Sequence, residues 1–142
     1  MIRRSLLTDL AAIKAFDVFS GNRLLEIADD HMLVAEFDGR VVGYVSWLPR
    51  GFIGRDYITH LGVEPGYQRR GIGRALLRAA EAVIAADRLF VSSDEENVTM
   101  VSLLSAEGWS PAGSVACVQE EDRTELFFYK NRAANILPGA PS

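Results

Sequence analysis

The strongest constraint on this chain is a short segment rich in arginine and glycine, at residues 68–73, that reads Gln-Arg-Arg-Gly-Ile-Gly. An apolar run at 57–63 precedes it, and apolar residues at helical spacing follow it. Glycine lacks a Cβ, so another molecule can approach the backbone closely. The first N–H groups of a helix have no partner inside the helix and lie at its positive end. A strand-to-helix turn of this kind, with added arginine charge, predicts an anion site and most simply a phosphate site.

Two common phosphate motifs do not fit the segment. Gly66 and Gly71 have the spacing of a Walker-A loop, but Ile72 and Gly73 stand where that loop needs Lys and then Ser or Thr. A dinucleotide fingerprint needs a third glycine where this chain has Leu76, and no second mononucleotide half follows. We therefore exclude an NTPase and a dinucleotide site. A tight turn with solvated arginines remains as the plain structural alternative.

The segment resembles the pyrophosphate loop of the GNAT superfamily of acetyl-CoA-dependent N-acyltransferases, whose signature is Q/R-x-x-G-x-G/A. Its flanks are similar too, with Val-Glu-Pro before it and Ala-Leu-Leu after it. A second block, at 97–109, has the helix-opening Asn and the Gly-aromatic ending found in the downstream half of that family. The resemblance covers residues 34–129.

The sequence predicts an α/β fold in which strands and helices are mixed along the chain. Thr8 is expected to cap the first helix, and Asp38-Gly39 predicts a hairpin turn. Residues 49–54 are expected to form a flexible loop. Predicted strands cover 2–5, 32–37, 41–47, 57–63, 89–92, 115–118 and 126–129, and further helices cover 22–28, 72–86 and 97–107. The buried stripe expected on the 72–86 helix comprises Ile72, Leu76, Ala79, Ala80, Val83 and Ile84.

A chain of 142 residues has the length of one domain. The resemblance implies a single GNAT-like domain over residues 1–132, and residues 133–142 are expected to form a disordered tail. Its sheet would be central, mixed and mostly antiparallel, flanked by helices and splayed between the fourth and fifth strands.

The resemblance also implies acetyl-CoA as cosubstrate and assigns residues to it. Pantetheine would pair with the fourth strand, the loop N–H groups would hold the pyrophosphate, and Asn97 would lie near the thiol end. For Asn97 a plain helix N-cap is an equally good interpretation, and the two roles can coexist. The predicted cofactor-binding residues are Leu61, Gly62, Val63, Gln68, Arg69, Arg70, Gly71, Ile72, Gly73, Arg74 and Asn97.

The implied reaction is direct attack of a primary amine on the thioester, with a backbone N–H near Leu61 stabilising the oxyanion and Gly62 easing a bulge in the strand. Relatives often place a carboxylate or histidine base on this strand. Here Tyr57 and Thr59 occupy the inward positions, and His60 is adjacent but is expected to point the other way. Tyr57 and His60 are the candidate side chains, although a core or surface histidine is the simpler interpretation of His60.

The chain departs from the family at Leu104, where many relatives carry the tyrosine that protonates the leaving thiolate. Ser102, Ser105 or Tyr129 could take that role, and the sequence does not choose among them. A non-catalytic acyl-CoA sensor is therefore kept as a second hypothesis.

The composition of the chain limits the classes of molecule that it is expected to bind. A net charge of −4 gives no support to nucleic-acid binding, and no apolar run reaches membrane-spanning length. Without a signal peptide, a cytoplasmic protein is expected. The two histidines lie far apart and predict no metal site, and the one cysteine, Cys117, reads as a small buried hydrophobe. The acceptor would be a small-molecule or peptide amine, and a homodimer is left open.

Overall fold

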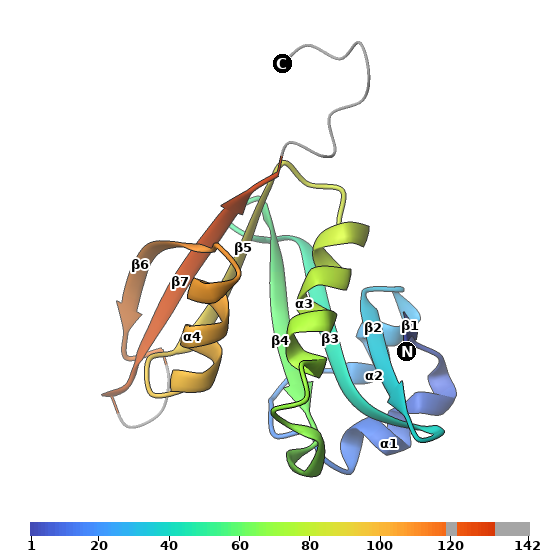
Figure 1. Cartoon of the computed structure of the whole chain (residues 1–142). Helices are drawn as coiled ribbons and strands as arrows, with labels where there is room; N and C mark the ends of the chain where they lie inside the picture. The colour runs from blue at the N-terminus through green and yellow to red at the C-terminus, as the bar shows by residue number, and fades with distance from the viewer. Residues whose placement is uncertain (119–121, 133–142) are drawn as a thin grey trace. The chain divides into compact units, whose positions relative to one another are not determined.

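A computed structural model describes residues 1–118 and 122–132 of the chain. The fold divides into two compact units, which are described here separately (Figure 1). The first unit comprises Met1–Leu48 and Ile58–Ile84, and the second comprises Pro49–Tyr57 and the described part of the chain from residue 85 onward. The expected tail at 133–142 lies outside the described residues, as do residues 119–121 of the last predicted turn.

The first unit is built on strands in the order β1-β2-β3-β4. The pairs β1/β2 and β2/β3 are antiparallel, with Arg3 opposite Val34 and Val34 opposite Tyr44. Its elements are β1 (Ile2–Arg4), η1 (Leu7–Asp9), α1 (Leu10–Lys14), α2 (Arg23–Ala28), β2 (Met32–Phe37), β3 (Arg40–Phe52), β4 (Arg55–Val63), η2 (Pro65–Tyr67) and α3 (Ile72–Val83). The far end of β3 and the first residues of β4 belong to the second unit.

Helices cover both faces of this four-stranded layer (Figure 1). On one face Ile13 of α1 and Ile27 of α2 pack in a buried cluster with Tyr44 of β3. On the other, a Cβ at Gly43 would lie 3.1 Å from Leu76 and 3.4 Å from Ile72, which places α3 against the next residue of the same strand. Successive residues of β3 thus point to opposite helical layers, as the alternation of a strand requires.

The expected helix after the glycine-rich segment is confirmed, and it ends at Val83. Leu76, Leu77 and Ala80 are its buried residues. The assignment of Val83 to the buried stripe was wrong, because the helix ends there and Val83 is 42% exposed.

Two tight turns fix the hairpins. Asp38 and Gly39 both have positive φ, 53° and 77°, which confirms the predicted turn between β2 and β3. The prediction of a flexible loop at 49–54 was wrong. The strand β3 continues to Phe52, and the chain reverses at Ile53-Gly54, where φ is again positive at both residues, 49° and 77°.

Thr8 is not a helix cap, contrary to the prediction. It lies inside the 3-10 turn η1, which runs directly into α1. The side chain that organises this turn is Asp9, whose Oδ2 accepts the Leu6 N–H at 2.7 Å. The second helix begins as expected, with Asn22 Oδ1 accepting the Leu25 N–H at 3.0 Å.

The second unit contains β5 (Arg88–Asp94), α4 (Val98–Ala106), β6 (Ser110–Ala116) and β7 (Thr124–Asn131). The strands are antiparallel and ordered β5-β7-β6. Alternate residues of β5 are buried, as are Leu104 of α4 and Phe128 of β7. The helix α4 ends before Gly108, which has φ 86°, and Trp109 returns to the core at 4% exposure.

Cys117 does not lie in the core. The prediction of a buried residue was wrong, because β6 ends at Ala116 and Cys117 stands in the following turn with φ 64° and an exposed side chain.

Candidate active site

The predicted phosphate loop leads from β4 into α3. After the short turn η2, the side chain of Gln68 folds back, and its Nε2 donates to the Val63 carbonyl at 3.1 Å. Gly71 is the residue before the helix and adopts the left-handed conformation, with φ 79°. The Gly71 carbonyl accepts the first helical bond, from Ala75 N at 3.0 Å. The loop therefore presents the positive end of a twelve-residue helix beside a backbone that carries no side chain.

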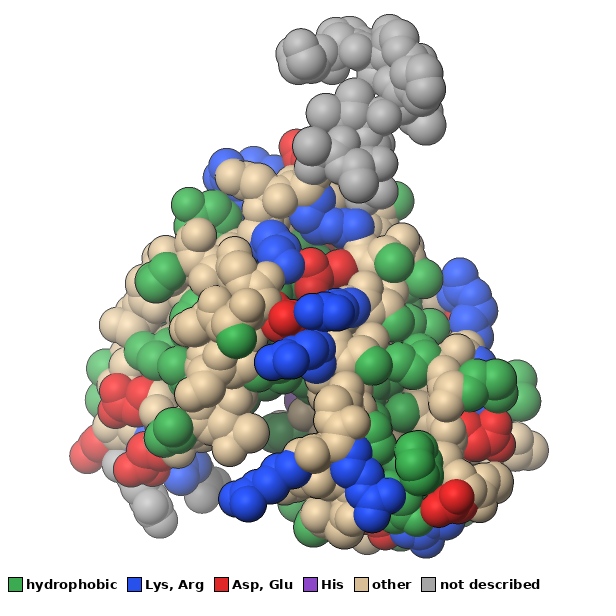
Figure 2. All heavy atoms as spheres, in the orientation of Figure 1, with side chains coloured by type: hydrophobic (Ala, Val, Ile, Leu, Met, Phe, Trp, Pro, Cys, Tyr) green, Lys and Arg blue, Asp and Glu red, His purple; other side chains and the backbone are tan. Residues whose placement is uncertain are grey.

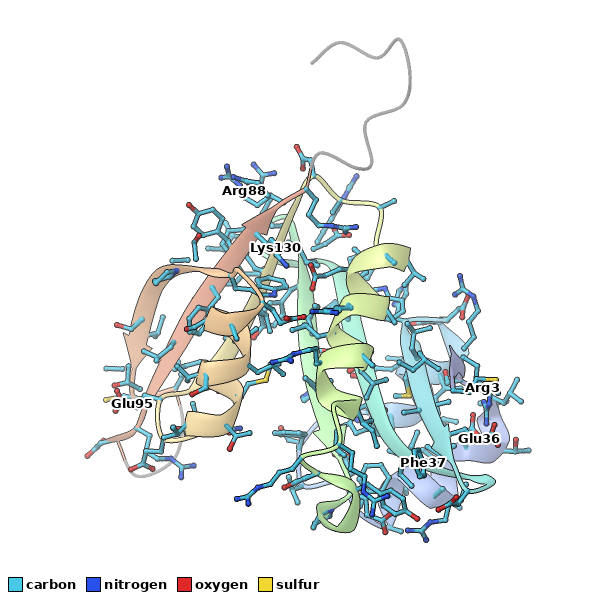
Figure 3. All side chains as sticks on the ribbon, in the orientation of Figure 1. Arg3, Glu36, Phe37, Arg88, Glu95 and Lys130 are labelled. Atoms are coloured by element: carbon cyan, nitrogen blue, oxygen red, sulfur yellow. The ribbon has the colours of Figure 1, made fainter. Side chains whose placement is uncertain are left out.

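Arg70 is used within the loop itself. Its guanidinium lies 4.9 Å from the centre of the Tyr67 ring and 5.6 Å from that of Phe37, which is labelled in Figure 3. Stacking of this kind holds the charge against β2. Arg69, which has φ 65°, and Arg74 in the first helical turn are both exposed. Figure 2 shows Lys and Arg side chains over α3 and the loop before it. Arg70 is thus engaged with two aromatic rings, and the first N–H groups of α3 have no partner within the helix.

The predicted pantetheine strand is partly exposed at Leu61, Gly62 and Val63. Gly62 has a packing reason that sequence did not reveal. A Cβ at this position would stand 2.9 Å from Cε1 of the buried Tyr44 ring, a distance that real Cβ contacts essentially never show.

His60 points toward the α1–α2 side of the first unit. Its Nδ1 lies 3.5 Å from Glu26 Oε2 and 3.4 Å from Ser46 Oγ, and the Phe19 ring is 5.5 Å away. Glu26 is itself 3.2 Å from Nε of the buried Arg23. His60 is therefore one member of a polar cluster.

The same cluster continues to β3. Arg23 donates to the Tyr44 hydroxyl at 3.0 Å, and that hydroxyl donates to Asp17 at 2.6 Å. Burial raises the pKa of Tyr44 well above its ordinary value. Sequence reasoning missed Asp17, Arg23 and Glu26, because they lie in a different part of the chain and carry no motif.

Tyr57, the other side-chain candidate, is described with the second unit. Its hydroxyl lies 2.5 Å from Ser92 Oγ, and Ser92 Oγ donates to Glu125 Oε2 at 2.7 Å. Burial raises the pKa of the Tyr57 hydroxyl. Neither Ser92 nor Glu125 was indicated by the sequence.

Asn97 is a helix cap, since its Oδ1 accepts the Met100 N–H at 3.2 Å. Leu104 is fully buried, at 0% exposure, whereas Ser102 and Ser105 on the same helix are exposed. Tyr129 lies on β7 with its ring 6.2 Å from Phe90. None of these placements selects a replacement for the usual tyrosine acid.

The described residues contain no group of three or more potential metal ligands. Within the same residues, no helix is both long enough and apolar enough to cross a membrane.

Comparison with known families decides the affiliation of the chain. The profile of the acetyltransferase (GNAT) family matches residues 5–109, which include the phosphate loop, α3 and α4. The chain belongs to the GNAT acetyltransferase family. Among curated proteins, no sequence match is found.

Solved structures share the fold. A GNAT-family acetyltransferase from Bacillus cereus superposes with a TM-score of 0.83 at 22% identity, over 93% of this chain and 96% of that one. A ribosomal-protein-alanine N-acetyltransferase from Brucella melitensis gives 0.76 at 25% identity, over 93% and 99%. The yncA protein of Salmonella typhimurium, solved with its cofactor acetyl-CoA, gives 0.77 at 21% identity, over 100% and 97%. The predicted α/β GNAT fold is confirmed.

Proposed function

We propose that this GNAT-family protein transfers the acetyl group of acetyl-CoA to a primary amine by direct attack in a ternary complex. The observation that carries the proposal is Gly71. Its left-handed backbone opens α3 after the turn η2 that follows β4, and a Cβ at this residue would meet no atom within 4 Å. Such a terminus binds phosphate groups through backbone N–H donors. The acetyl-CoA in the Salmonella structure, which has the same fold, supports this ligand.

In this proposal the N–H groups of residues 69–74 hold the pyrophosphate. The backbone of Leu61, Gly62 and Val63 pairs with pantetheine, and Asn97 combines its cap with a contact near the thiol end. Gln68 closes the loop through Val63. Arg70 contributes by holding the loop against β2 rather than by contacting phosphate directly.

The chemistry is acyl transfer. The amine nitrogen attacks the thioester carbonyl, the oxygen becomes an oxyanion, and a fixed N–H at Leu61 lowers the energy of that anion. The tetrahedral intermediate then expels the CoA thiolate. Because a thiol has a pKa of about 8.5, thiolate departs without an obligatory acid, which is compatible with Leu104 at the family's tyrosine position.

The acceptor is a small-molecule or peptide amine. The amine must be neutral to attack. A free α-amine with a pKa of about 8 is about one-tenth neutral at pH 7, whereas a lysine amine with a pKa of about 10.4 is far less so. The name of the Brucella relative, a ribosomal-protein-alanine N-acetyltransferase, makes a protein acceptor one class to assay first.

A second function, acyl-CoA sensing without transfer, is favoured by one observation. Leu104 is buried and offers no hydroxyl. A sensor would keep the loop and lose the catalytic groups.

The decisive experiment measures CoA release and the mass of the amine product with a panel of amines. The panel contains small diamines, free amino acids and peptides with different N-terminal residues. We expect amine-dependent CoA release and a product heavier by one acetyl group. Tight acetyl-CoA binding with no acetylated product from any amine would establish the sensor and refute transfer.

A further inference from the structure

Two aromatic rings and two arginines meet within the first unit, where the β2–β3 hairpin contacts the phosphate loop. Phe37 is the last residue of β2, and Figure 3 labels it near the loop that precedes α3. Its ring centre lies 5.6 Å from that of Tyr67, with the ring planes inclined at 66°. Arg40, opposite Phe37 in the hairpin, lies 5.4 Å from the centre of the Tyr67 ring. Since Arg70 lies over both rings, the four side chains form one stacked cluster.

The stacked cluster joins the loop to β2 beside a gap in the packing. A cavity of about 180 Å³ is bounded by β1, β2 and the start of α3. Phe37 lines it from β2, and Gly71, Ile72 and Ala75 line it from the start of the helix. Arg70 lines the same cavity, so its contact with the Phe37 ring connects the loop to β2 where apolar packing is incomplete.

The backbone of the loop needs such a connection. Arg69 has φ 65° and Gly71 has φ 79°, so left-handed residues stand on both sides of Arg70. Glycine adopts this conformation readily, whereas an L-residue such as Arg69 is disfavoured in it. A segment of this kind keeps its shape only where surrounding contacts hold it. The contacts of Arg70 with the two rings supply that hold between the two left-handed residues.

The first part of the loop is attached differently, by hydrogen bonds. The Glu64 N–H donates to the Val42 carbonyl of β3 at 2.7 Å, and the Glu64 carboxylate accepts from Arg40. The Tyr67 N–H donates to the Glu64 carbonyl at 2.8 Å. These bonds do not involve the side chain of Phe37. The stacking contact can therefore be removed by substitution while the backbone attachment at residue 64 is kept.

We propose that Phe37 is a positioning residue for acetyl-CoA. By holding Arg70, its ring keeps the N–H groups at the start of α3 in the arrangement that receives the pyrophosphate, and Phe37 itself does not touch the ligand. This inference rests on the acetyl-CoA site of the proposed function and is independent of acetyl transfer. A loop that has the binding arrangement for only a fraction of the time raises the dissociation constant by the inverse of that fraction.

A double-mutant cycle tests the coupling between the ring and the arginine. Acetyl-CoA is titrated calorimetrically into the parent, Phe37→Ala, Arg70→Ala and the variant with both changes. We expect each single change to raise the dissociation constant about tenfold, as for a loop that is competent about one-tenth of the time. The double variant should also lose about tenfold, rather than the roughly hundredfold product, because both changes break the same contact.

Two further substitutions at residue 37 separate stacking from apolar bulk. Phe37→Tyr keeps the ring and should bind acetyl-CoA within about twofold of the parent. Phe37→Leu keeps a large apolar side chain without an aromatic face and should bind as weakly as Phe37→Ala. Leu24→Ala is the control for truncating an exposed apolar side chain in the same unit, because Leu24 is 50% exposed and Phe37 is 39% exposed. It should leave the dissociation constant unchanged.

Hydrogen exchange of the ligand-free protein gives a readout of the loop itself. The Ala75 amide donates to the Gly71 carbonyl and closes the first turn of α3. In Phe37→Ala this amide should exchange about tenfold faster, while the melting temperature and the exchange of β3 amides stay close to those of the parent. In the transfer assay, the same variant should raise the KM for acetyl-CoA about tenfold and leave kcat unchanged.

The outcomes distinguish this inference from the proposed function. A parent that binds no acetyl-CoA refutes both. If the parent binds acetyl-CoA, and Phe37→Ala and Phe37→Leu bind it within about twofold of the parent, the cofactor site stands and Phe37 has no positioning role. If Arg70→Ala alone weakens binding, or if the two losses multiply in the double variant, Arg70 acts on the ligand directly and the inference is wrong. Melting temperatures of all variants separate a loss of fold from a loss of binding.

Discussion

Individual glycines determine the geometry of the candidate site for different reasons. Gly71 needs a left-handed backbone, with φ 79°, although a Cβ there would meet nothing within 4 Å. Gly62 needs space instead, because a Cβ would meet the Tyr44 ring. Gly66, in the same loop as Gly71, has neither constraint, since a Cβ there meets no atom within 4 Å and its φ is not in the left-handed range.

These differences give a matched pair of variants. Gly71→Ala should lower the free energy of unfolding by about 1 kcal/mol, because an L-residue is strained at positive φ. Gly66→Ala should leave it unchanged or raise it by up to about 1 kcal/mol, because alanine reduces the entropy of the unfolded chain. Chemical denaturation of both variants measures the difference. Equal effects at the two positions would show that φ at Gly71 does not matter for stability.

The Arg3–Asp9 pair gives a pH-dependent prediction. Arg3 donates to both oxygens of Asp9, at 2.9 and 3.0 Å, and this hydrogen bonding is the main reason why the pKa of Asp9 is lowered. A carboxyl with a lower pKa in the folded state stabilises the fold above its unfolded pKa of ~3.9 and loses that contribution as pH falls through the folded value. The free energy of unfolding of Asp9→Asn should therefore be about 1–3 kcal/mol below that of the parent at pH 7. When the pH falls below about 4, the free energy of unfolding of the variant should decrease by less than that of the parent.

The exposed Arg4–Asp30 pair, at 2.8 Å, is the control for this prediction. Asp30→Asn should change stability by less than about 1 kcal/mol, as exposed ion pairs do. Urea unfolding at pH 7 and pH 3 compares the two variants. A larger effect at Asp30 than at Asp9 would contradict the argument from burial.

At the residue scale, sequence predicted what depends on local chain geometry. The turn at Asp38-Gly39 and the N-cap of Asn97 follow from neighbours within a few positions. The chain from Tyr57 to Glu125 and the contact of His60 with Glu26 join residues far apart in sequence. Such contacts depend on strand order and register, which no single motif encodes.

At the level of elements, most helices and strands were predicted because their apolar period is clear. The hairpin after β3 was missed because Pro49 and two glycines at 51 and 54 suggest a loop. In the structure this segment is a strand and a tight turn, with positive φ at Arg50, Ile53 and Gly54. The Arg50 N–H also donates to Asp56 at 3.1 Å.

The start of α4 provides a test at this scale. Asn97→Ala should lower the free energy of unfolding by about 1 kcal/mol, the usual cost of a lost N-cap. Asn22→Ala, which removes the equivalent cap of α2, should cost a similar amount. If Asn97 also contacts the cofactor, only Asn97→Ala should weaken acetyl-CoA binding, as measured by titration calorimetry. Equal binding by the two variants would leave Asn97 as a cap alone.

At the scale of the whole molecule, the family and the fold were predictable because two spaced blocks, at 68–73 and 97–109, both match. The acceptor was not predictable. The side chains that contact an amine are not part of the phosphate loop, and GNAT-fold structures with 21–25% identity to this chain share the fold without settling its acceptor. The predicted single domain over residues 1–132 and the splay between the fourth and fifth strands stay predictions.

The central claim is that the Gly71 turn at the start of α3 binds acetyl-CoA, and calorimetric titration of acetyl-CoA into the parent, Gly66→Val and Gly71→Val tests it most directly. A Cβ meets no protein atom within 4 Å at either residue, but in the proposed complex a β-branched side chain at residue 71 would occupy the place of the pyrophosphate. We predict micromolar binding by the parent, a dissociation constant within about threefold of it for Gly66→Val, and no measurable binding by a folded Gly71→Val. Parent-like binding by Gly71→Val, or a parent that binds ATP or NAD but not acetyl-CoA, would contradict the account.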